Sequence, residues 1–189
     1  SYETEPEPEL NNRRIYWPRG KGLGGSSSIN GMIYIRGVPV DFAAWEQAGA
    51  KGWSWEEVLP YFIKAEQQQT HDDGLHGADG PLHVQDVVDK RPIQETFLDA
   101  MEEQGVPRNS DFNGIDQAGC GHYQFTQKNG RRWSTSSAYL NPARKRSNLE
   151  IRTKVQTKRI IFEQNKAVGV ETERSGRSET IRARHVILS

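Results

Sequence analysis

The stretch GKGLGGSSSINGMIYIRG, residues 20–37, decides how this chain is interpreted. Its glycines match the G-x-G-x-x-G pattern of a dinucleotide-binding loop at Gly20, Gly22 and Gly25. A loop of that kind follows a buried strand. The residues before it, NNRRIYWPR, contain Pro18 and flanking arginines, which disfavour a buried parallel strand. The sequence therefore argues against a Rossmann fingerprint at this position.

Local pattern alone leaves two interpretations of these glycines open. Gly24 and Gly25 let the backbone approach a ligand closely, and the three serines that follow offer donors at an expected helix start. That arrangement suits an anionic or polar group of a cofactor. The alternative is an ordinary turn followed by a helix cap, because short glycine motifs often occur without a ligand.

The bulk composition predicts a small core. The chain has 189 residues, of which 34% are hydrophobic, and its mean hydropathy is −0.82. The sequence opens with SYETEPEPEL, without a methionine. We therefore expect an internal piece of a longer protein, whose exposed faces meet segments outside this chain. The length suits one domain or two small ones.

Charge and cysteine content narrow the partners. The 25 basic residues balance 25 acidic ones, so nothing in the total favours nucleic acid or an anionic membrane. The basic run from Arg144 to Arg159 alternates like the solvated face of a strand. Cys120 is the sole cysteine, which excludes an intrachain disulfide and fits a reducing compartment. No apolar run approaches the ~18 residues of a membrane span. We expect a cytoplasmic location, with peripheral association at the inner membrane as the alternative.

Periodicity and capping signals predict a mixture of helices and short strands. Ser54 and Glu57 form an S-x-x-E capping box before an apolar helical face, inside which Pro60 predicts a kink. Other helices are expected over residues 26–36, 41–48, 93–104 and 134–141, and strands over 81–85 and 122–127. From residue 149 onward, short alternating runs separated by turn signals predict a β-meander with a final strand in HVILS.

Longer blocks of the sequence carry a family resemblance. They are RGKGLGGSSSINGMIYIRG, DFAAWEQAGAKGWSWEEVLPYFIKAE, HGADGPLHV, PRNSDFNGIDQAGCGHYQFTQKNGRRWSTSSAYLNPA, SNLEIRT and AVGVE. In this order they resemble the glucose–methanol–choline (GMC) flavin oxidoreductases, and within that family most resemble bacterial choline dehydrogenases and related alcohol dehydrogenases. The resemblance covers essentially the whole chain.

The resemblance implies a fold class and a domain division. The class is α/β, in the sense of a mixture of α and β elements from a GMC-type FAD-binding domain and a substrate domain. Residues 1–78 would be an FAD-domain portion with the flavin loop, and residues 79–133 a substrate-domain portion. Residues 134–189 would be a second FAD-domain portion containing the β-meander.

The resemblance also implies cofactor-binding residues. In the family, the corresponding glycine–serine loop covers the flavin. Carried over, the residues that would contact FAD are Gly24, Gly25, Ser26, Asn30, Gly31, Met32 and Ile33, and Thr157 would meet the adenine through its backbone. Some relatives attach FAD through a histidine where this chain has Ile29, so we expect non-covalent FAD.

The activity implied for the parent enzyme is oxidation of a primary alcohol to an aldehyde, with hydride transfer to flavin N5. The family's pyrophosphate loop and catalytic histidine have no counterpart in this sequence, so we assign no catalytic residue here. The expected partners are a small-molecule alcohol, an electron acceptor of unknown identity and the remaining segments of the parent enzyme. We expect the isolated chain to turn over no alcohol.

Several alternatives compete with this interpretation. One is a non-catalytic interaction domain on the same scaffold, and another is a hydroxynitrile lyase-type member of the family. The loop histidines His71, His76 and His83 lie near several aspartates but lack typical zinc spacing, so we expect no metal site. Serines 134, 136 and 137 lack a G-x-S-x-G nucleophile motif, and helix capping explains them better than hydrolase chemistry.

Overall fold

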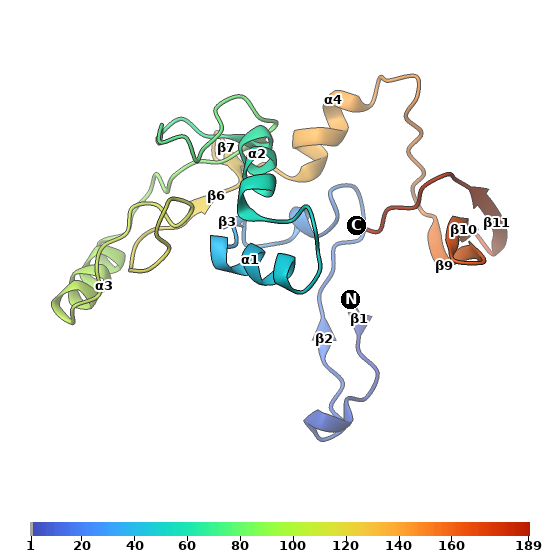
Figure 1. The fold of residues 1–189 in the computed structure, drawn as a ribbon, viewed down its shortest axis with the longest axis horizontal. Coiled ribbons are helices and arrows are strands. Elements are labelled where there is room, and N and C mark those ends of the chain that lie inside the picture. The colour runs from blue at the N-terminus through green and yellow to red at the C-terminus, as the bar shows by residue number, and fades with distance from the viewer. Residues whose placement is uncertain (1) are drawn as a thin grey trace. The chain divides into compact units, whose positions relative to one another are not determined.

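The computed structural model describes residues 2–189. Its chain divides into two units, Ser1–Arg144 and Lys145–Ser189, and each is treated by itself (Figure 1). The mixed helix-and-strand class predicted from the sequence is confirmed. The finer division into flavin-domain and substrate-domain portions at residues 78 and 133 stays a prediction.

Helix α2, Trp55–Ala65, shows how local signals set the elements of the first unit. The Glu57 amide donates to Ser54 Oγ at 3.4 Å, and the Ser54 amide donates back to Glu57 Oε2 at 3.2 Å. This reciprocal pair is the predicted capping box, and it satisfies two amides at the helix start. Pro60 lies inside the helix without ending it.

The other helices of this unit begin with comparable contacts. Helix α1, Pro39–Gln47, starts with proline at its first position, and Asp41 Oδ2 accepts from the Val38 amide at 2.9 Å. Helix α3 is Pro92–Glu103. Near the end of this unit, a π-helical turn, η3 (Ser136–Leu140), continues directly into α4 (Asn141–Ala143). The helical path therefore extends past Pro142, further than the sequence predicted.

The expected helix over residues 26–36 is mostly absent. Only a 3₁₀ turn, η2, forms over Gly25–Ser28, and a short strand, β3, follows at Ile33–Tyr34. The reason is local, because Asn30 Oδ1 accepts from the Met32 amide at 3.1 Å and Met32 takes a φ of 64°. A left-handed residue at that point ends any helical continuation.

Short strand pairs connect distant parts of the first unit. Strand β3 pairs antiparallel with β6, Gln124–Phe125, while β4 (Glu66–Gln67) pairs in parallel with β5 (Leu82–His83). The remaining pairs are β1 (Tyr2–Glu3) with β2 (Tyr16–Trp17), and β7 (Gln127–Lys128) with β8 (Arg131–Arg132). A 3₁₀ turn, η1, spans Pro8–Leu10.

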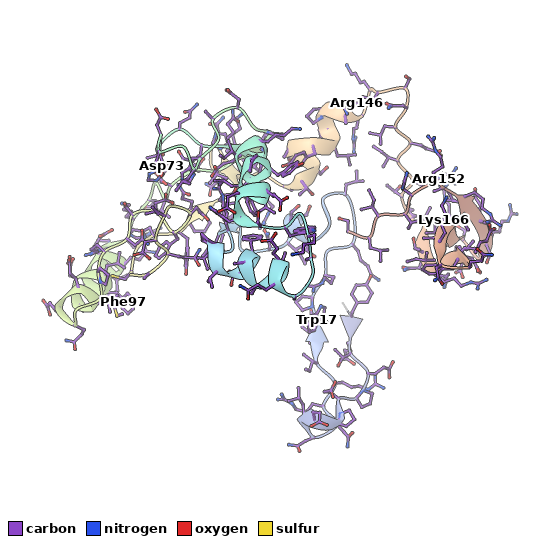
Figure 2. The ribbon with its side chains drawn as sticks, in the orientation of Figure 1. Trp17, Asp73, Phe97, Arg146, Arg152 and Lys166 are labelled. Atoms are coloured by element: carbon purple, nitrogen blue, oxygen red, sulfur yellow. The ribbon has the colours of Figure 1, made fainter. Side chains whose placement is uncertain are left out.

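The core of the first unit is small and partly aromatic. The Phe42 ring on α1 lies 5.4–5.9 Å, centroid to centroid, from the rings of Trp45, Trp55 and Phe62. In Figure 1, α1 and α2 lie next to each other, which agrees with the ring contacts between them. Away from it, large apolar side chains remain exposed, and Figure 2 marks Phe97 on α3, which is 61% exposed. The low apolar content of the sequence is thus reflected in the packing.

The second unit is an antiparallel meander. Its strands are β9 (Gln156–Glu163), β10 (Lys166–Arg174) and β11 (Arg177–Arg182), in the order β11-β10-β9. The predicted meander is confirmed over these residues. Residues 149–155 and the closing HVILS, which the sequence also predicted as strand, lie outside the strands because no neighbouring strand in residues 2–189 pairs with them.

Exposed ion pairs account for much of the basic run in this unit. Arg159 pairs with Glu171 across β9 and β10 at 2.6 Å, and Lys158 pairs with Glu173 at 3.1 Å. These contacts agree with a solvated strand face rather than a free basic patch. Among the described residues, no helix combines the length and apolar character that crossing a bilayer requires.

Candidate cofactor-binding loop

Seven of the eight predicted cofactor-binding residues lie in one continuous surface stretch of the first unit, residues 24–33, here called the loop segment. Gly24 and Gly25 have φ values of 89° and 51°, which L side chains rarely adopt. A Cβ on Gly24 would lie 2.4 Å from Ser28 Oγ, whereas a Cβ on Gly25 or Gly31 would meet nothing within 4 Å. Gly24 is therefore needed for the turn itself, while Gly25 and Gly31 face open space.

The loop segment presents hydrogen-bond donors without partners. Within residues 2–189, no acceptor takes a hydrogen bond from Asn30 Nδ2 or from the Gly31 amide. Ile29 and Ile33, on either side of Asn30 in the sequence, are 56% and 50% exposed. Unpaired donors flanked by apolar side chains suit a ligand that combines acceptor atoms with a flat apolar surface, and the flavin ring is such a group.

A second stretch, residues 126–135, fixes the loop segment and is here called the support segment. Arg132 Nη1 donates to the Ser27 carbonyl at 3.1 Å and to Asn30 Oδ1 at 2.7 Å. Arginine is a donor only, so it faces the carboxamide oxygen of Asn30 and leaves Nδ2 free.

Two threonines of the support segment add further contacts. The Thr135 amide donates to Ser27 Oγ at 3.0 Å, and Thr135 Oγ1 donates to the Gly24 carbonyl at 3.3 Å. At the other end, the Thr126 amide and Oγ1 both donate to the Met32 carbonyl, at 2.8 and 3.2 Å. The loop segment is thus held near both of its ends by one later part of the chain.

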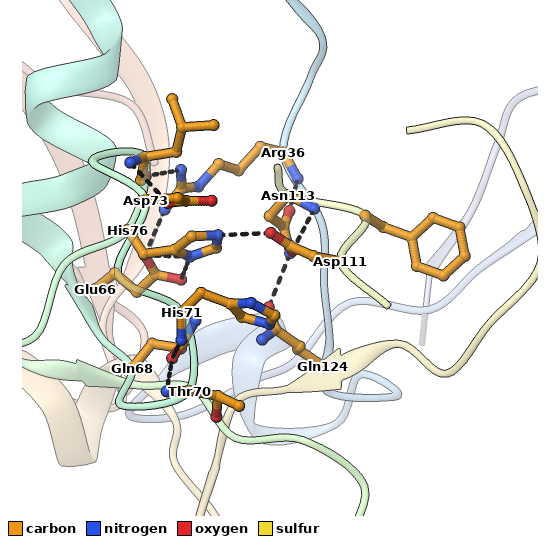
Figure 3. A network of polar contacts seen from close by, with 12 residues as sticks. Arg36, Glu66, Gln68, Thr70, His71, Asp73, His76, Asp111, Asn113 and Gln124 are labelled. Carbon is orange, nitrogen blue, oxygen red and sulfur yellow. Dashed lines mark hydrogen bonds and ion pairs between the residues drawn. The ribbon is translucent and has the colours of Figure 1, made fainter. Parts of the chain in front are cut away.

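Figure 3 shows a largely buried set of charged and polar side chains, here called the polar network, which begins with Arg36, three residues after the loop segment. It consists of Arg36, Glu66, His76, Asp111 and Asn113. Arg36 Nη2 and Glu66 Oε2 are 2.5 Å apart, with both side chains 2% exposed or less. Glu66 also accepts from the Gly77 amide at 3.0 Å. Such a pair requires several hydrogen bonds to offset its lost hydration.

His76 lies between two carboxylates of this network. Its Nδ1 is 3.1 Å from Glu66 Oε1, and its Nε2 is 2.9 Å from Asp111 Oδ2. Burial disfavours the charged imidazolium, but the hydrogen bonds to Glu66 and Asp111 outweigh this and raise the pKa of His76. Each ring nitrogen faces a carboxylate oxygen, so both act as donors when the ring is protonated.

The polar network is tied to the backbone that follows the loop segment. Asn113 Oδ1 accepts from the Arg36 amide at 2.8 Å, and Asn113 Nδ2 donates to the Tyr34 carbonyl at 3.1 Å. Gln117 Nε2 donates to the Arg36 carbonyl at 3.0 Å. The backbone of Tyr34 and Arg36 is consequently held by hydrogen bonds immediately after the exposed loop, and Arg36 is buried while Ile35 stays exposed.

The eighth predicted residue, Thr157, belongs to the second unit. It is exposed on β9 and pairs with Thr172 of β10, beside a register shift between Glu171 and Thr172. Its proposed contact with adenine stays a prediction.

Cavities of the first unit differ in their relation to the loop segment. A hollow of about 480 Å³ is lined by side chains around α3, including His71, Arg108 and His122, and by no residue of the loop segment. A second hollow, of about 700 Å³, is lined by Lys128, Arg132 and neighbouring residues of the support segment. Arg132 therefore adjoins both this hollow and Asn30.

Competing sites are explained by local contacts. Asp73, His76 and Asp111 offer potential metal ligands within 4.8 Å of one another. Both nitrogens of His76 already face carboxylates, however, which suits an imidazolium rather than a metal ligand. The Ser137 amide donates to Ser134 Oγ at 3.3 Å, as expected for a helix cap. His122 instead contacts Glu95 at 2.7 Å.

Sequence reasoning identified the loop segment but assigned no role to the support segment or the polar network. Apart from Arg36, the residues of both sets lie far from the loop in the sequence, and Arg132 is 102 positions from Asn30. In the sequence, the support segment was marked only by the block QKNGRRWSTS, which is part of the family resemblance but had no assigned function.

Comparisons with known proteins agree with these observations. The oxygen-dependent choline dehydrogenase of Sinorhizobium fredii (strain NBRC 101917 / NGR234) is 50% identical over 189 residues, which are 100% of this chain and 34% of that protein. The enzyme of the same name from Vibrio vulnificus (strain YJ016) is 46% identical over 190 residues, with the same coverage. The chain thus spans about a third of the length of these relatives.

Solved structures share the fold. Pyridoxine 4-oxidase from Mesorbium loti superposes with a TM-score of 0.87 at 33% identity, covering 97% of this chain and 36% of that one. An FAD-dependent oxidoreductase from Chaetomium thermophilum gives a TM-score of 0.87 at 26% identity, covering 97% of this chain and 34% of that one.

The family profile described as GMC oxidoreductase matches residues 7–189. Together with these relatives, it confirms the family predicted from the sequence and, for that family, FAD as the cofactor. The chain belongs to the GMC oxidoreductase family.

Proposed function

We propose that this chain supplies the flavin-contacting loop of an FAD-dependent oxidoreductase that oxidises a primary alcohol to an aldehyde. The observation that carries the proposal is the loop segment itself. Its backbone is fixed by the support segment, and its unpaired donors, Asn30 Nδ2 and the Gly31 amide, lie at the surface. A loop whose shape is set before the ligand arrives binds with a smaller ordering cost.

The residues of the loop segment would act by binding and by excluding water. Asn30 Nδ2 and the Gly31 amide would donate to acceptor atoms of the cofactor. Ile29 and Ile33 would lose exposed apolar surface against it, and full burial of such a side chain contributes about 1.5–3 kcal/mol. An isoleucine at position 29 offers no nucleophile, so we propose that FAD is held non-covalently. When bound, FAD accepts the hydride from the alcohol carbon.

Substrate and acceptor follow from the relatives. The names of the curated relatives indicate choline as substrate and oxygen as acceptor, and we propose the same substrate class for the whole protein of which this chain is a part. We also propose that the catalytic base and the pyrophosphate-binding loop come from the remaining segments of that protein. The isolated chain is then inactive. A cytoplasmic location fits the single cysteine, Cys120.

The test uses the intact gene product. Its flavin absorbance is recorded before and after denaturation and filtration, since non-covalent FAD passes the filter. Choline, other primary alcohols and a cyanohydrin are then supplied, with and without oxygen. The proposal predicts flavin bleaching by an alcohol without oxygen. A protein without flavin, as expected for an interaction domain, or aldehyde release from a cyanohydrin without bleaching, as expected for a lyase, would contradict it.

The contribution of the loop is tested with Asn30→Ala in the same protein, and Asn148→Ala is the matched control. Asn148 is exposed, and no described residue takes a hydrogen bond from its side chain. We expect Asn30→Ala to weaken FAD binding and Asn148→Ala to leave it unchanged. Equal FAD affinity in all three proteins would remove the loop from the cofactor site.

A further inference from the structure

We infer that Arg132 is a positioning residue for the cofactor site: it holds the carboxamide of Asn30 so that Nδ2 is the group presented to the ligand. This inference rests on the proposed function. It adds a residue that the loop pattern did not include, and it specifies that the ligand atom opposite Asn30 is a hydrogen-bond acceptor.

The orientation of the Asn30 carboxamide follows from its neighbours. Its Oδ1 is 2.7 Å from Arg132 Nη1 and 3.1 Å from the Met32 amide nitrogen. Both neighbours can only donate, so the atom between them must be the oxygen. Reversing the amide would set an NH₂ group against two donors. The side chain of Asn30 is therefore fixed in one orientation.

The charge of Arg132 affects the remaining donor as well. A guanidinium at Oδ1 polarises the amide, and linked hydrogen bonds strengthen one another in this way. Asn30 is exposed, and its Nδ2 has no acceptor among residues 2–189. The donor is thus both oriented and strengthened on the side where the ligand is proposed to lie.

Arg132 has a second contact, with the Ser27 carbonyl at 3.1 Å, so its loss could act through the loop backbone alone. Two variants separate these effects. Asn30→Asp keeps an acceptor for Arg132 and the Met32 amide but removes the Nδ2 donor. Arg132→Lys keeps the charge and a donor, although a lysine cannot reproduce the guanidinium geometry.

The experiment measures the dissociation constant of FAD, the flavin absorbance spectrum and thermal stability in the intact protein. Arg131→Gln is the matched control, because Arg131 is the exposed neighbour and its side chain donates no hydrogen bond to the loop segment among the described residues, unlike that of Arg132. We expect Arg132→Gln and Asn30→Asp each to weaken FAD binding roughly 10- to 100-fold, the range for loss of a charge-assisted hydrogen bond. Arg132→Lys should recover part of the loss, and Arg131→Gln should bind FAD normally.

The double variant Arg132→Gln/Asn30→Ala is decisive. If Arg132 acts through Asn30, it should bind FAD no more weakly than Asn30→Ala alone. Additive losses, or normal FAD affinity in Arg132→Gln, would overturn this inference while leaving the proposed function standing. A wild-type protein that binds no FAD would instead overturn the proposed function, and this inference with it.

Discussion

Arg132 Nη1 donates to Asn30 Oδ1 at 2.7 Å, although 102 positions separate the two residues. The same oxygen accepts from the Met32 amide, and Met32 is held at a φ of 64°. Asn30 Oδ1 therefore accepts both a long-range hydrogen bond, from Arg132, and a local one, from the Met32 amide in the turn. The conformation of the loop segment is consequently a property of the folded unit rather than of the glycines alone.

Two glycines of the loop segment should respond differently to alanine. In Gly24→Ala, the new Cβ would lie 2.4 Å from Ser28 Oγ at a φ of 89°, so we expect a loss of about 1–2 kcal/mol in the free energy of unfolding. In Gly31→Ala, the Cβ meets nothing within 4 Å, so we expect stability to stay within about 0.5 kcal/mol.

Gly31→Ala should nevertheless weaken FAD binding, because the added methyl would stand where the ligand is proposed to approach. Urea denaturation and FAD titration of both variants provide the check. Unchanged FAD affinity in Gly31→Ala would show that no ligand comes close to this backbone.

Ser27 links the loop segment to the support segment. Its Oγ contacts the Gly24 carbonyl and both the amide and Oγ1 of Thr135. Ser27→Ala should lower the free energy of unfolding by about 1–3 kcal/mol, because several hydrogen bonds of about 0.5–1.5 kcal/mol each are lost. Ser28→Ala, which loses one bond to the Leu23 carbonyl, is the control. Equal effects of the two variants in thermal unfolding would contradict the assigned role of Ser27.

The polar network predicts a pH dependence of stability. The pKa of His76 is raised in the folded protein above its ordinary value of 6.5, so folding favours the protonated ring. The stabilisation is fully present below the unfolded-state pKa and is lost as the pH rises through the folded-state value. The free energy of unfolding attributable to His76 should therefore fall as the pH rises above about 6.5.

Chemical denaturation of wild type, His76→Gln and His185→Gln across this pH range provides the measurement. His185 is exposed in the second unit and serves as the control. His76→Gln should lose this part of the pH dependence, whereas His185→Gln should keep it. If the free energy of unfolding of His76→Gln changed with pH in parallel with that of wild type, the protonated ring of His76 would not be the source of the pH dependence.

Removing one partner of the buried Arg36–Glu66 ion pair should strongly lower the free energy of unfolding. Glu66→Gln leaves the Arg36 guanidinium, 5% exposed as a residue, without its carboxylate. We expect the free energy of unfolding to fall by about 3–5 kcal/mol, as for other buried pairs that lose one partner. The exposed pair between Arg14 and Glu5 is the comparison, and Glu5→Gln should have no clear effect. Similar denaturation midpoints for the two variants would argue against a structural role for Glu66.

Features encoded within a few residues could be predicted from the sequence. The capping box of Ser54 and Glu57 lies within one turn, and the meander from 156 to 182 shows alternation and turn residues. The loop segment was predicted through family resemblance, and its residues do lie in one surface stretch. The proposed helix over 26–36 was wrong because helical spacing does not reveal that Asn30 captures the Met32 amide.

Contacts between distant residues could not be predicted. Glu66 meets Arg36 across 30 positions, and His76 meets Asp111 across 35. Their sequence surroundings are those of ordinary loops and strand ends, so nothing marks them as buried. From the sequence, His76 and the nearby aspartates were considered only as metal ligands, for which their spacing is not typical. Burial and pairing of such groups are decided by tertiary packing rather than by local pattern.

The central claim is that Asn30 faces the cofactor, and a crystal structure of the intact protein with FAD tests it most directly. The measurement is the distance from Asn30 Nδ2 to the nearest acceptor atom of FAD. We predict a value within hydrogen-bond range, about 2.7–3.2 Å, with Arg132 still on Oδ1. FAD bound elsewhere, with Asn30 Nδ2 facing solvent or protein, would contradict the account.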